Sequence, residues 1–338
     1  MSQQEKAKNA LPGFLPTRFR DLGIGAIVVF VAVAFGVAQP NFFRPENLSA
    51  IVVSISIVVV MAIGQMFVIV TRQIDLSIGS ILGLSAMVMA MVARDFPDTP
   101  VVILALIAIV VGALCGVLNG ALVTLAGVPP IIATLGTLAL FRGLIFVISD
   151  NTQVNPSEIP AQVSDIARPG VFGIPPLVLI AILVALAGWY FASRTMAGLR
   201  LFAVGSNSEA AQARGLNPGR VSFWVFVLMG ALAGLAGLLY VSRFATVNPA
   251  DVGFGWELTV ISAVVIGGTN IFGGSGSVPG VVLGCLLVGV LANGLTVVGI
   301  SGFWQQAAEG AIILIAVVID TMVRRQSLKA QSIKRSSK

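Results

Sequence analysis

The sequence predicts an all-α, polytopic membrane protein with about ten transmembrane helices. Of its 338 residues, 57% are hydrophobic and 10% are charged, and the mean hydropathy is +0.99. A soluble domain carries about 25% charged residues. Long apolar stretches alternate with short polar segments, and about 20 apolar residues let a helix cross a bilayer. The net charge of +6 does not indicate nucleic-acid binding, because the positive residues lie between and beyond these stretches.

The apolar stretches define the expected spans in order. A polar tail, residues 1–21, comes first. The next stretch is interpreted as an uncleaved helix rather than a removed signal peptide, because further spans follow it. The expected spans cover residues 22–38, 48–70, 76–93, 101–125, 131–148, 177–192, 221–241, 256–272, 278–298 and 304–323. They form one lipid-embedded domain over residues 22–323, followed by a basic tail over residues 324–338.

The distribution of positive charge predicts the orientation. Ten spans place both termini on one side, and that side carries 15 of the 20 Lys and Arg residues, against four on the other. Cytoplasmic loops are enriched in Lys and Arg. We therefore expect a multi-pass membrane protein, with both termini and loop 193–220 in the cytoplasm and loop 149–176 outside.

Residues 203–221 are the one polar internal segment with the pattern of ordered structure. Ser206 or Asn207 can cap a short helix over residues 208–214, Glu209 suits its first turn, and Gly215 can end it in the left-handed conformation. A two-turn helix is unstable alone in water, so it needs something to pack on. The segment is either a solvated connection or a docking helix for a cytoplasmic partner.

Two other polar connections are interpreted as structural turns. Asp75 can accept hydrogen bonds from backbone N–H groups two or three residues on, and so start the third span with Ser77. A direct role in gating is the alternative. A second turn contains Gly273, Gly274 and Gly276, whose small size lets two helices turn tightly and approach closely.

No source of energy for transport is visible in the chain. The glycine-rich residues 267–277 lack the lysine that a phosphate-binding loop needs. There is no histidine, and Cys115 and Cys285 lie in apolar runs, as buried side chains do. We therefore expect no catalytic residue, metal or cofactor in this chain. A separate protein that supplies the energy would have to dock on its cytoplasmic face, which favours the docking interpretation of residues 203–221.

A short internal similarity suggests a repeat. The sequence GVLNG at residues 116–120 resembles GVLANG at residues 289–294, and each precedes a break and a further span. Spans 2–5 and 7–10 would then form an inverted repeat, a common transporter architecture with the substrate path at the repeat interface. Chance similarity between helices rich in Gly and Leu is the alternative.

A few polar residues inside the spans are candidates for the substrate path. Arg142 and Glu309 each lie about 8–9 Å below the outer surface at 1.5 Å per residue. A lone charge there is costly, so we expect an Arg142–Glu309 ion pair; otherwise Arg142 reaches outward and Glu309 faces an aqueous vestibule. Amide and aromatic side chains suit a polar solute with hydroxyl groups, although Asn and Gln also join helices by hydrogen bonds. These candidates are Asn119, Asn293, Trp304, Gln305 and Gln306.

A series of short motifs occurs in order between residues 45 and 321. They are IDLSIGS (74–80), TLGT (134–137), FRG (141–143), EAA-x3-G (209–215), GALAGLAGLLY (230–240), WELTVISAVVIGG (256–268), FGGSGS (272–277), NGL (293–295) and FWQQ (303–306). In this order they resemble the permeases of ribose-type ABC importers, in the clan that also holds branched-chain amino acid permeases.

The resemblance implies a permease subunit of the bacterial inner membrane, with loop 149–176 in the periplasm, that would move a monosaccharide or sugar-like solute from the periplasm into the cytoplasm. It implies a second permease copy or a close relative, a periplasmic sugar-binding protein, and a cytoplasmic ATPase that binds ATP, often with two fused nucleotide-binding domains. In the family, the EAA-like loop contacts the ATPase. The expected coupling residues are Asn207, Glu209, Ala210, Ala211, Arg214, Gly215 and Leu216.

One departure from the family limits the assignment of the substrate. The common family form has Gly-Gly before Ile-Asp-Leu-Ser, whereas this chain has Thr71-Arg72-Gln73. A subset handling deoxysugars or furanosyl signals looks more like this, so ribose itself is not assigned. The alternative function is a self-contained secondary transporter or channel for a small polar solute, which would work without an ATPase.

Overall fold

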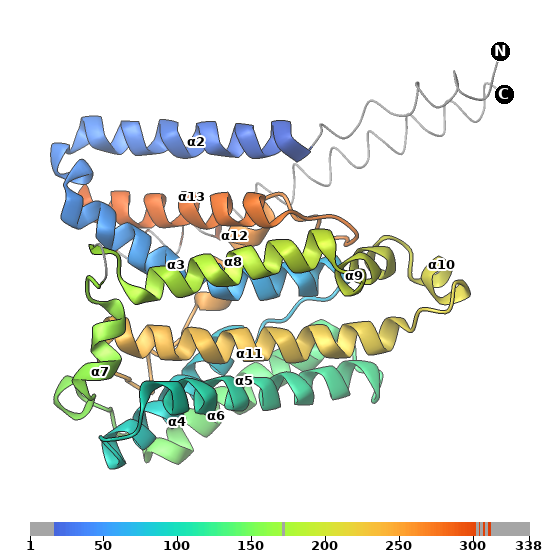
Figure 1. Ribbon diagram of the computed structural model, residues 1–338, viewed down its shortest axis with the longest axis horizontal. Coiled ribbons are helices and arrows are strands. Elements are labelled where there is room, and N and C mark those ends of the chain that lie inside the picture. The colour runs from blue at the N-terminus through green and yellow to red at the C-terminus, as the bar shows by residue number, and fades with distance from the viewer. Residues whose placement is uncertain (1–16, 171–172, 302–303, 305–306, 308–309, 312–338) are drawn as a thin grey trace.

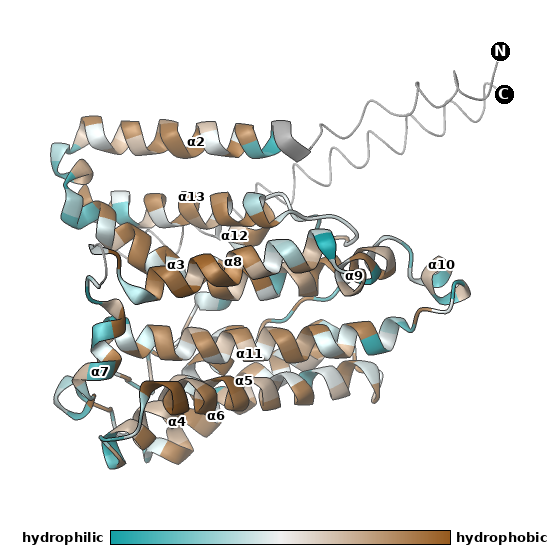
Figure 2. Cartoon of the chain, in the orientation of Figure 1, coloured by the Kyte–Doolittle hydropathy of each residue, from teal (hydrophilic) through white to brown (hydrophobic). Residues whose placement is uncertain are grey.

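The computed structural model describes residues 17–170 and 173–301, together with residues 304, 307, 310 and 311. This part of the chain forms a bundle of helices without strands; one isolated antiparallel bridge joins Val154 to Val247. The all-α prediction is confirmed. Hydrophobic residues make up most of the length of the helices, as the colouring in Figure 2 shows.

The helices follow the chain in the expected order (Figure 1). The long helices are α2 (Thr17–Ala38), α3 (Pro45–Val70), α4 (Ile78–Asp95), α5 (Val101–Thr124), α6 (Pro130–Ser149), α8 (Pro176–Arg194), α11 (Pro218–Phe244) and α13 (Val278–Val297). The short helices are η1 (Pro40–Phe43), η2 (Pro156–Glu158), α7 (Ala161–Ser164), η3 (Asp165–Ala167), α9 (Met196–Ser206), α10 (Ser208–Ala213) and α12 (Trp256–Ile266).

Eight helices in the described ranges are long and apolar enough to cross a membrane. The total of ten stays a prediction, because the expected tenth span, residues 304–323, lies almost wholly outside these ranges. The expected eighth span, residues 256–272, is wrong in length, because α12 ends at Ile266. The chain turns at Gly268, whose φ is +79°, a conformation that glycine adopts without strain.

The bundle has two polar ends, which we name the α7 end and the α10 end after the short helices there (Figure 1). Helix α3 lies at the centre, with 83% of its most apolar window buried, against 6% for the peripheral α2. Helices α5 and α11 pack backbone to backbone, because Gly112 faces Gly230 where any Cβ would collide with a carbonyl. The buried core therefore sits around α3, α4, α5 and α11.

Two sets of three helices are arranged in the same way. In each set a long helix (α3 or α11) leads through an irregular segment to a shorter helix (α4 or α12) and then to a third (α5 or α13). Helix α11 packs on α5 and α4, and α3 correspondingly packs on α13 and α12. This pattern agrees with the expected inverted repeat, which stays a prediction because residues 312–323 are not described.

The irregular segments enter the bundle from opposite ends. Residues 71–77 start at the α10 end and reach the first turn of α4, while residues 245–255 start at the α7 end and reach the first turn of α12. They meet where Gly79 and Gly253 lie in backbone contact. Irregular backbone at membrane depth is tolerated only where protein buries it or where it lines a cavity.

Candidate functional site

The short helix α10 forms at the tip of one polar end, within the expected docking segment. Its N-cap is Asn207, whose Oδ1 accepts a hydrogen bond from the Ala210 N–H at 2.9 Å. Gly215 follows the helix with φ of +83°. Asn217 caps the next helix in the same manner, with its Oδ1 2.9 Å from the Arg220 N–H. Local signals therefore suffice to place this helix.

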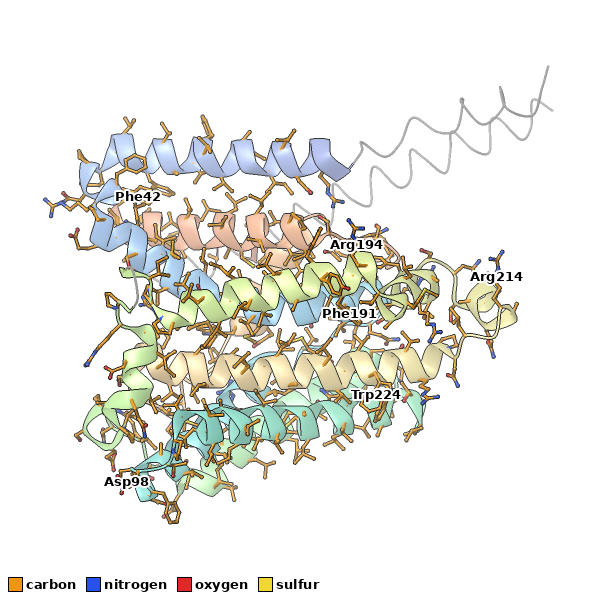
Figure 3. The ribbon with its side chains drawn as sticks, in the orientation of Figure 1. Phe42, Asp98, Phe191, Arg194, Arg214 and Trp224 are labelled. Atoms are coloured by element: carbon orange, nitrogen blue, oxygen red, sulfur yellow. The ribbon has the colours of Figure 1, made fainter. Side chains whose placement is uncertain are left out.

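Most of the expected coupling residues are accessible. Glu209, Ala210, Arg214 and Gly215 are exposed, whereas Ala211 is buried and helps to hold the helix in place. Arg214 lies at the tip of the molecule, as Figure 3 shows. Its side chain makes no ion pair with any residue that the structure describes. This end therefore presents a small ordered polar surface.

The segment before α10 differs from the expected loop. Residues 193–220 contain a second helix, α9, which starts at Thr195, whose Oγ1 accepts from the Gly198 N–H at 3.1 Å. The sequence signal for α9 is a threonine that can cap a helix, followed by eleven residues without proline. The docking segment is thus a pair of helices, α9 and α10, which continue from α8.

Arg72 joins this pair of helices to the core. Its Nε donates to the Gly205 carbonyl and its Nη2 to the Ser206 carbonyl, each at 2.6 Å. These carbonyls end α9, where a cation is favourable. Arg72 has φ of +65°, which an L-residue rarely adopts, so its two hydrogen bonds offset backbone strain.

The expected glycine turn completes this junction. The Gly274 N–H donates to the Val70 carbonyl at 2.9 Å, at the end of α3. Gly273 and Gly274 have φ of +85° and +80°. A Cβ on Gly205 would collide with Val70, so three segments distant in sequence meet here through their backbones. Gly276 packs against Thr269 in the same turn.

Beyond Arg72, residues 71–77 lead to a buried polar network. Asp75 Oδ1 accepts from the Ser77 N–H at 2.9 Å and from Ser77 Oγ at 2.7 Å. The Nδ2 of Asn119, on α5, donates to Ser77 Oγ at 2.8 Å and to Asp75 Oδ2 at 3.3 Å. The hydroxyl of Thr137, on α6, donates to Asn119 Oδ1 at 2.7 Å. Asp75 thus fixes the start of α4 and links it to two other helices.

This network is closed to solvent. Asp75, Ser77 and Asn119 are each 0% exposed. Gln65, in α3, adds a bond from Nε2 to the Asp75 carbonyl at 3.2 Å. The Asn119 amide already has partners for its oxygen and its nitrogen, so its position corresponds to a helix-joining residue.

The proposed pairing of Arg142 is not tested, because Glu309 lies outside the described residues. Arg142 Nη1 donates to the Val252 carbonyl at 2.6 Å, and the guanidinium lies 5.9 Å from the centre of the Phe254 ring. It therefore anchors residues 245–255. Gln305 and Gln306 also fall outside the description, while Trp304 is exposed.

Asn293 lies in a different setting from Asn119. It forms a reciprocal amide pair with Asn47, with both N···O distances at 2.9 Å, between α13 and α3. It also lines a cavity of about 280 Å³ at the α7 end. The structure therefore does not bring Asn119 and Asn293 into one site.

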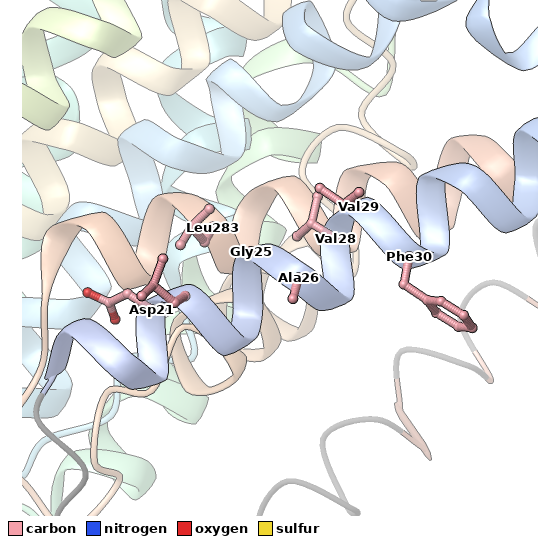
Figure 4. Close-up of a pocket in the computed structure, with 8 residues that line it drawn as sticks. Asp21, Gly25, Ala26, Val28, Val29, Phe30 and Leu283 are labelled. Carbon is pink, nitrogen blue, oxygen red and sulfur yellow. The ribbon is translucent and has the colours of Figure 1, made fainter.

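A larger hollow of about 950 Å³ lies between α2 and α13 (Figure 4). Its walls include Leu22, Val29, Phe30 and Leu283, and among the described residues Asp21 is the only charged group that lines it. None of the expected site residues that the structure describes belongs to it. Its walls suit acyl chains better than a polar solute.

A bundle of long apolar helices with an ordered polar tip defines a polytopic transport component rather than a soluble catalyst. Residues 47–317 match the family described as branched-chain amino acid transport system / permease component, and the chain belongs to this family. Members are permease subunits, so this chain is a transport subunit and not an enzyme.

Relatives with printed transport roles cover most of the chain. The ribose import permease protein of Escherichia coli K12 is 36% identical over 301 residues, which is 87% of this chain and 91% of the relative. The D-allose transport system permease protein of the same strain is 34% identical, covering 88% and 91%. The autoinducer 2 import system permease protein of Photorhabdus temperata is 32% identical, covering 88% and 90%. No solved structure matches the chain.

Proposed function

We propose that this chain is the transmembrane permease subunit of an ABC importer for a monosaccharide or sugar-like solute. The observation that carries the proposal is similarity over most of the chain to permeases that import ribose, allose and autoinducer 2. The order of the helices and the exposed polar tip at α10 agree with it. The departure at Arg72 leaves the individual solute open within this class.

The α10 end is the cytoplasmic end in this proposal. Arg72, Arg194, Arg200, Arg214 and Arg220 all lie at or near it, and positive residues favour the cytoplasmic side. Both termini are then cytoplasmic, and the α7 end faces the periplasm. The membrane is the inner membrane, whose lipid surrounds the apolar helix faces.

The ATPase docks on α10 in this proposal. The contact residues are Glu209, Ala210, Arg214, Gly215 and Leu216, with Asn207 and Ala211 holding the helix in shape. The ATPase supplies ATP binding, with two nucleotide-binding domains in one chain. A second permease copy or close relative completes the membrane part, and a periplasmic binding protein delivers the solute.

Arg72 passes movement from the docking helices to the core. Its guanidinium holds the end of α9, while its backbone leads directly to Asp75 and the start of α4. Since Asn119 and Thr137 belong to the same network, α5 and α6 respond with α4. A rigid displacement of α9 and α10 therefore reaches three membrane helices through Arg72, in addition to the backbone contact of Gly205 with Val70.

The docking proposal is tested by bulky substitutions on α10. Glu209→Trp and Gly215→Leu should keep the protein in the membrane but abolish co-purification of the ATPase. Gly173→Leu is the matched control, because Gly173 also has a positive φ and open space around it but lies in the loop after η3, before α8. Normal assembly and transport by the α10 variants would show that the docking surface lies elsewhere.

A further inference from the structure

The cavity beside Asn293 lies where four helices meet at the α7 end. It has a volume of about 280 Å³ and is lined by residues of α3, α12 and α13 and by the last residues of α11. Pockets for small ligands usually begin at about 300 Å³. The space therefore suits one small solute.

Two aromatic rings form part of its wall. The Trp256 ring is held by Tyr240 in an edge-to-face contact, with centroids 5.7 Å apart. Phe244 contributes the second ring, and the Arg243 guanidinium lies 5.7 Å from its centroid. The Arg243 Nε is buried and has no hydrogen-bond partner among the residues described. A buried donor without a partner is costly unless a ligand or water meets it.

Polar side chains complete the lining. The Asn293 amide is fixed in orientation by Asn47, and each amide retains further hydrogen-bonding capacity. Ser54 and Thr296 add hydroxyl groups. Beside the cavity, Ile55 lies against Gly289 so closely that α3 and α13 leave no passage between them there.

We propose that this cavity receives a polyhydroxylated solute of monosaccharide size on its way through the permease. The inference rests on the proposed import function and adds the receiving site to it. The aromatic rings suit the C–H faces of such a solute, while Arg243, Asn293 and Ser54 suit its hydroxyl groups. Passage beyond the cavity requires α3 and α13 to separate at Ile55 and Gly289.

The first test measures import by the complete complex in proteoliposomes, with radiolabelled D-ribose and D-allose as probes. Trp256→Ala and Arg243→Met should each lower the maximal import rate about tenfold, while assembly and ATP hydrolysis stimulated by the binding protein stay within about twofold. Trp224→Ala is the matched control, because Trp224 is exposed on the same helix as Arg243 but lines no part of the cavity. Import within about twofold of the wild type for both cavity variants would overturn the proposal.

The second test does not depend on the identity of the solute. In a background of Cys115→Ala and Cys285→Ala, Ser54→Cys should react with a charged, membrane-impermeant thiol reagent added outside at least tenfold faster than Val110→Cys. Val110 is a suitable control because its side chain is exposed on the apolar face of α5, near the middle of that helix. Equal, slow labelling would overturn the cavity proposal. If the wild-type complex imports neither D-ribose nor D-allose, that result counts against the proposed sugar class. The labelling of Ser54→Cys still tests whether the cavity is open to water from outside.

Discussion

Asn119 and Asn293 stand near opposite ends of the bundle, on helices that correspond in the two sets of three. Asn119 lies five residues before the end of α5, and Asn293 lies four residues before the end of α13. The first is 0% exposed, with its amide committed to Ser77, Asp75 and Thr137. The second faces a cavity. A polar side chain with all its partners inside the protein stabilises it, whereas one with spare capacity beside a cavity can meet a solute.

The two settings imply different consequences for the same substitution. Around Asn119 the buried polar groups form hydrogen bonds with one another. They include the Asp75 carboxylate, which forms no ion pair with any described residue. Around Asn293 the amide pair keeps two helices in register, but Arg243 Nε has no hydrogen-bond partner among the described residues. We therefore assign the network to folding and to the proposed coupling, and the cavity to the proposed binding of the solute.

The largest contrast should appear in stability. Asn119→Leu removes two hydrogen bonds to the Asp75–Ser77 turn and leaves the buried carboxylate short of a donor, which should lower the free energy of unfolding by about 3 kcal/mol. Asn293→Leu should cost about 1 kcal/mol, because its partner Asn47 is only partly buried and keeps its bond to the Phe42 carbonyl. Thermal unfolding of both purified variants in the same detergent measures the difference. Equal losses would remove the distinction between the two sites.

A second contrast concerns coupling. Arg72→Gly should fold, because glycine adopts φ of +65° freely, but it loses both bonds to the end of α9. We expect the number of ATP molecules hydrolysed per solute imported to rise about fivefold, since the docking helices then move without α4. The ratio is measured in proteoliposomes with the complete complex.

Arg200→Ala is the control for that experiment, because Arg200 is an exposed arginine on α9. It should leave the ratio unchanged. If Arg72→Gly keeps the wild-type ratio, movement does not pass through this side chain. If instead the variant fails to assemble, Arg72 is a docking element rather than a positioning residue.

The smallest effect is expected at the exposed α7 end. Glu158 Oε2 accepts from the Asn155 N–H at 2.7 Å, and this bond, with that from the Asn155 side chain, holds the pKa of Glu158 below its usual range. Its contribution is present above the unfolded pKa of about 4.3 and is lost as the pH falls through the lower folded pKa. The protection of the Asn155 amide, which is the intrinsic exchange rate at the same pH relative to the observed rate, should therefore fall at acid pH and in Glu158→Gln, while the buried Asp75 turn stays protected. Unchanged protection at Asn155 would remove this capping contact from the account.

The sequence predicted those features that depend on local chemistry. The Asn207 cap and the Gly215 conformation follow from neighbouring residues. Helix α9 is not predicted, because its residues fall within the expected loop 193–220. The length of α12 is overestimated because the apolar residues Ile271 and Phe272 follow the glycines, whereas the helix ends at Ile266 and the chain turns at Gly268, whose φ is +79°.

The sequence alone does not predict the contacts between segments that are far apart in the chain. Nothing near Arg72 in the chain indicates that its guanidinium meets Gly205, 133 residues away. Asn119 and Asn293 have similar flanking residues, yet their surroundings differ. Asn119 donates a hydrogen bond to Asp75, whereas Asn293 lines a cavity. Such differences arise from tertiary packing, so composition and spacing cannot separate them.

The central claim is that this permease moves its solute only when an ATPase docked on α10 hydrolyses ATP. The most direct measurement compares solute uptake by proteoliposomes that hold this chain with its permease partner alone and by those that also hold the ATPase and the binding protein. We predict uptake only in the complete system and only with ATP, with loss of uptake in Gly215→Leu. Uptake at an equal rate by the permease without the ATPase would contradict the account.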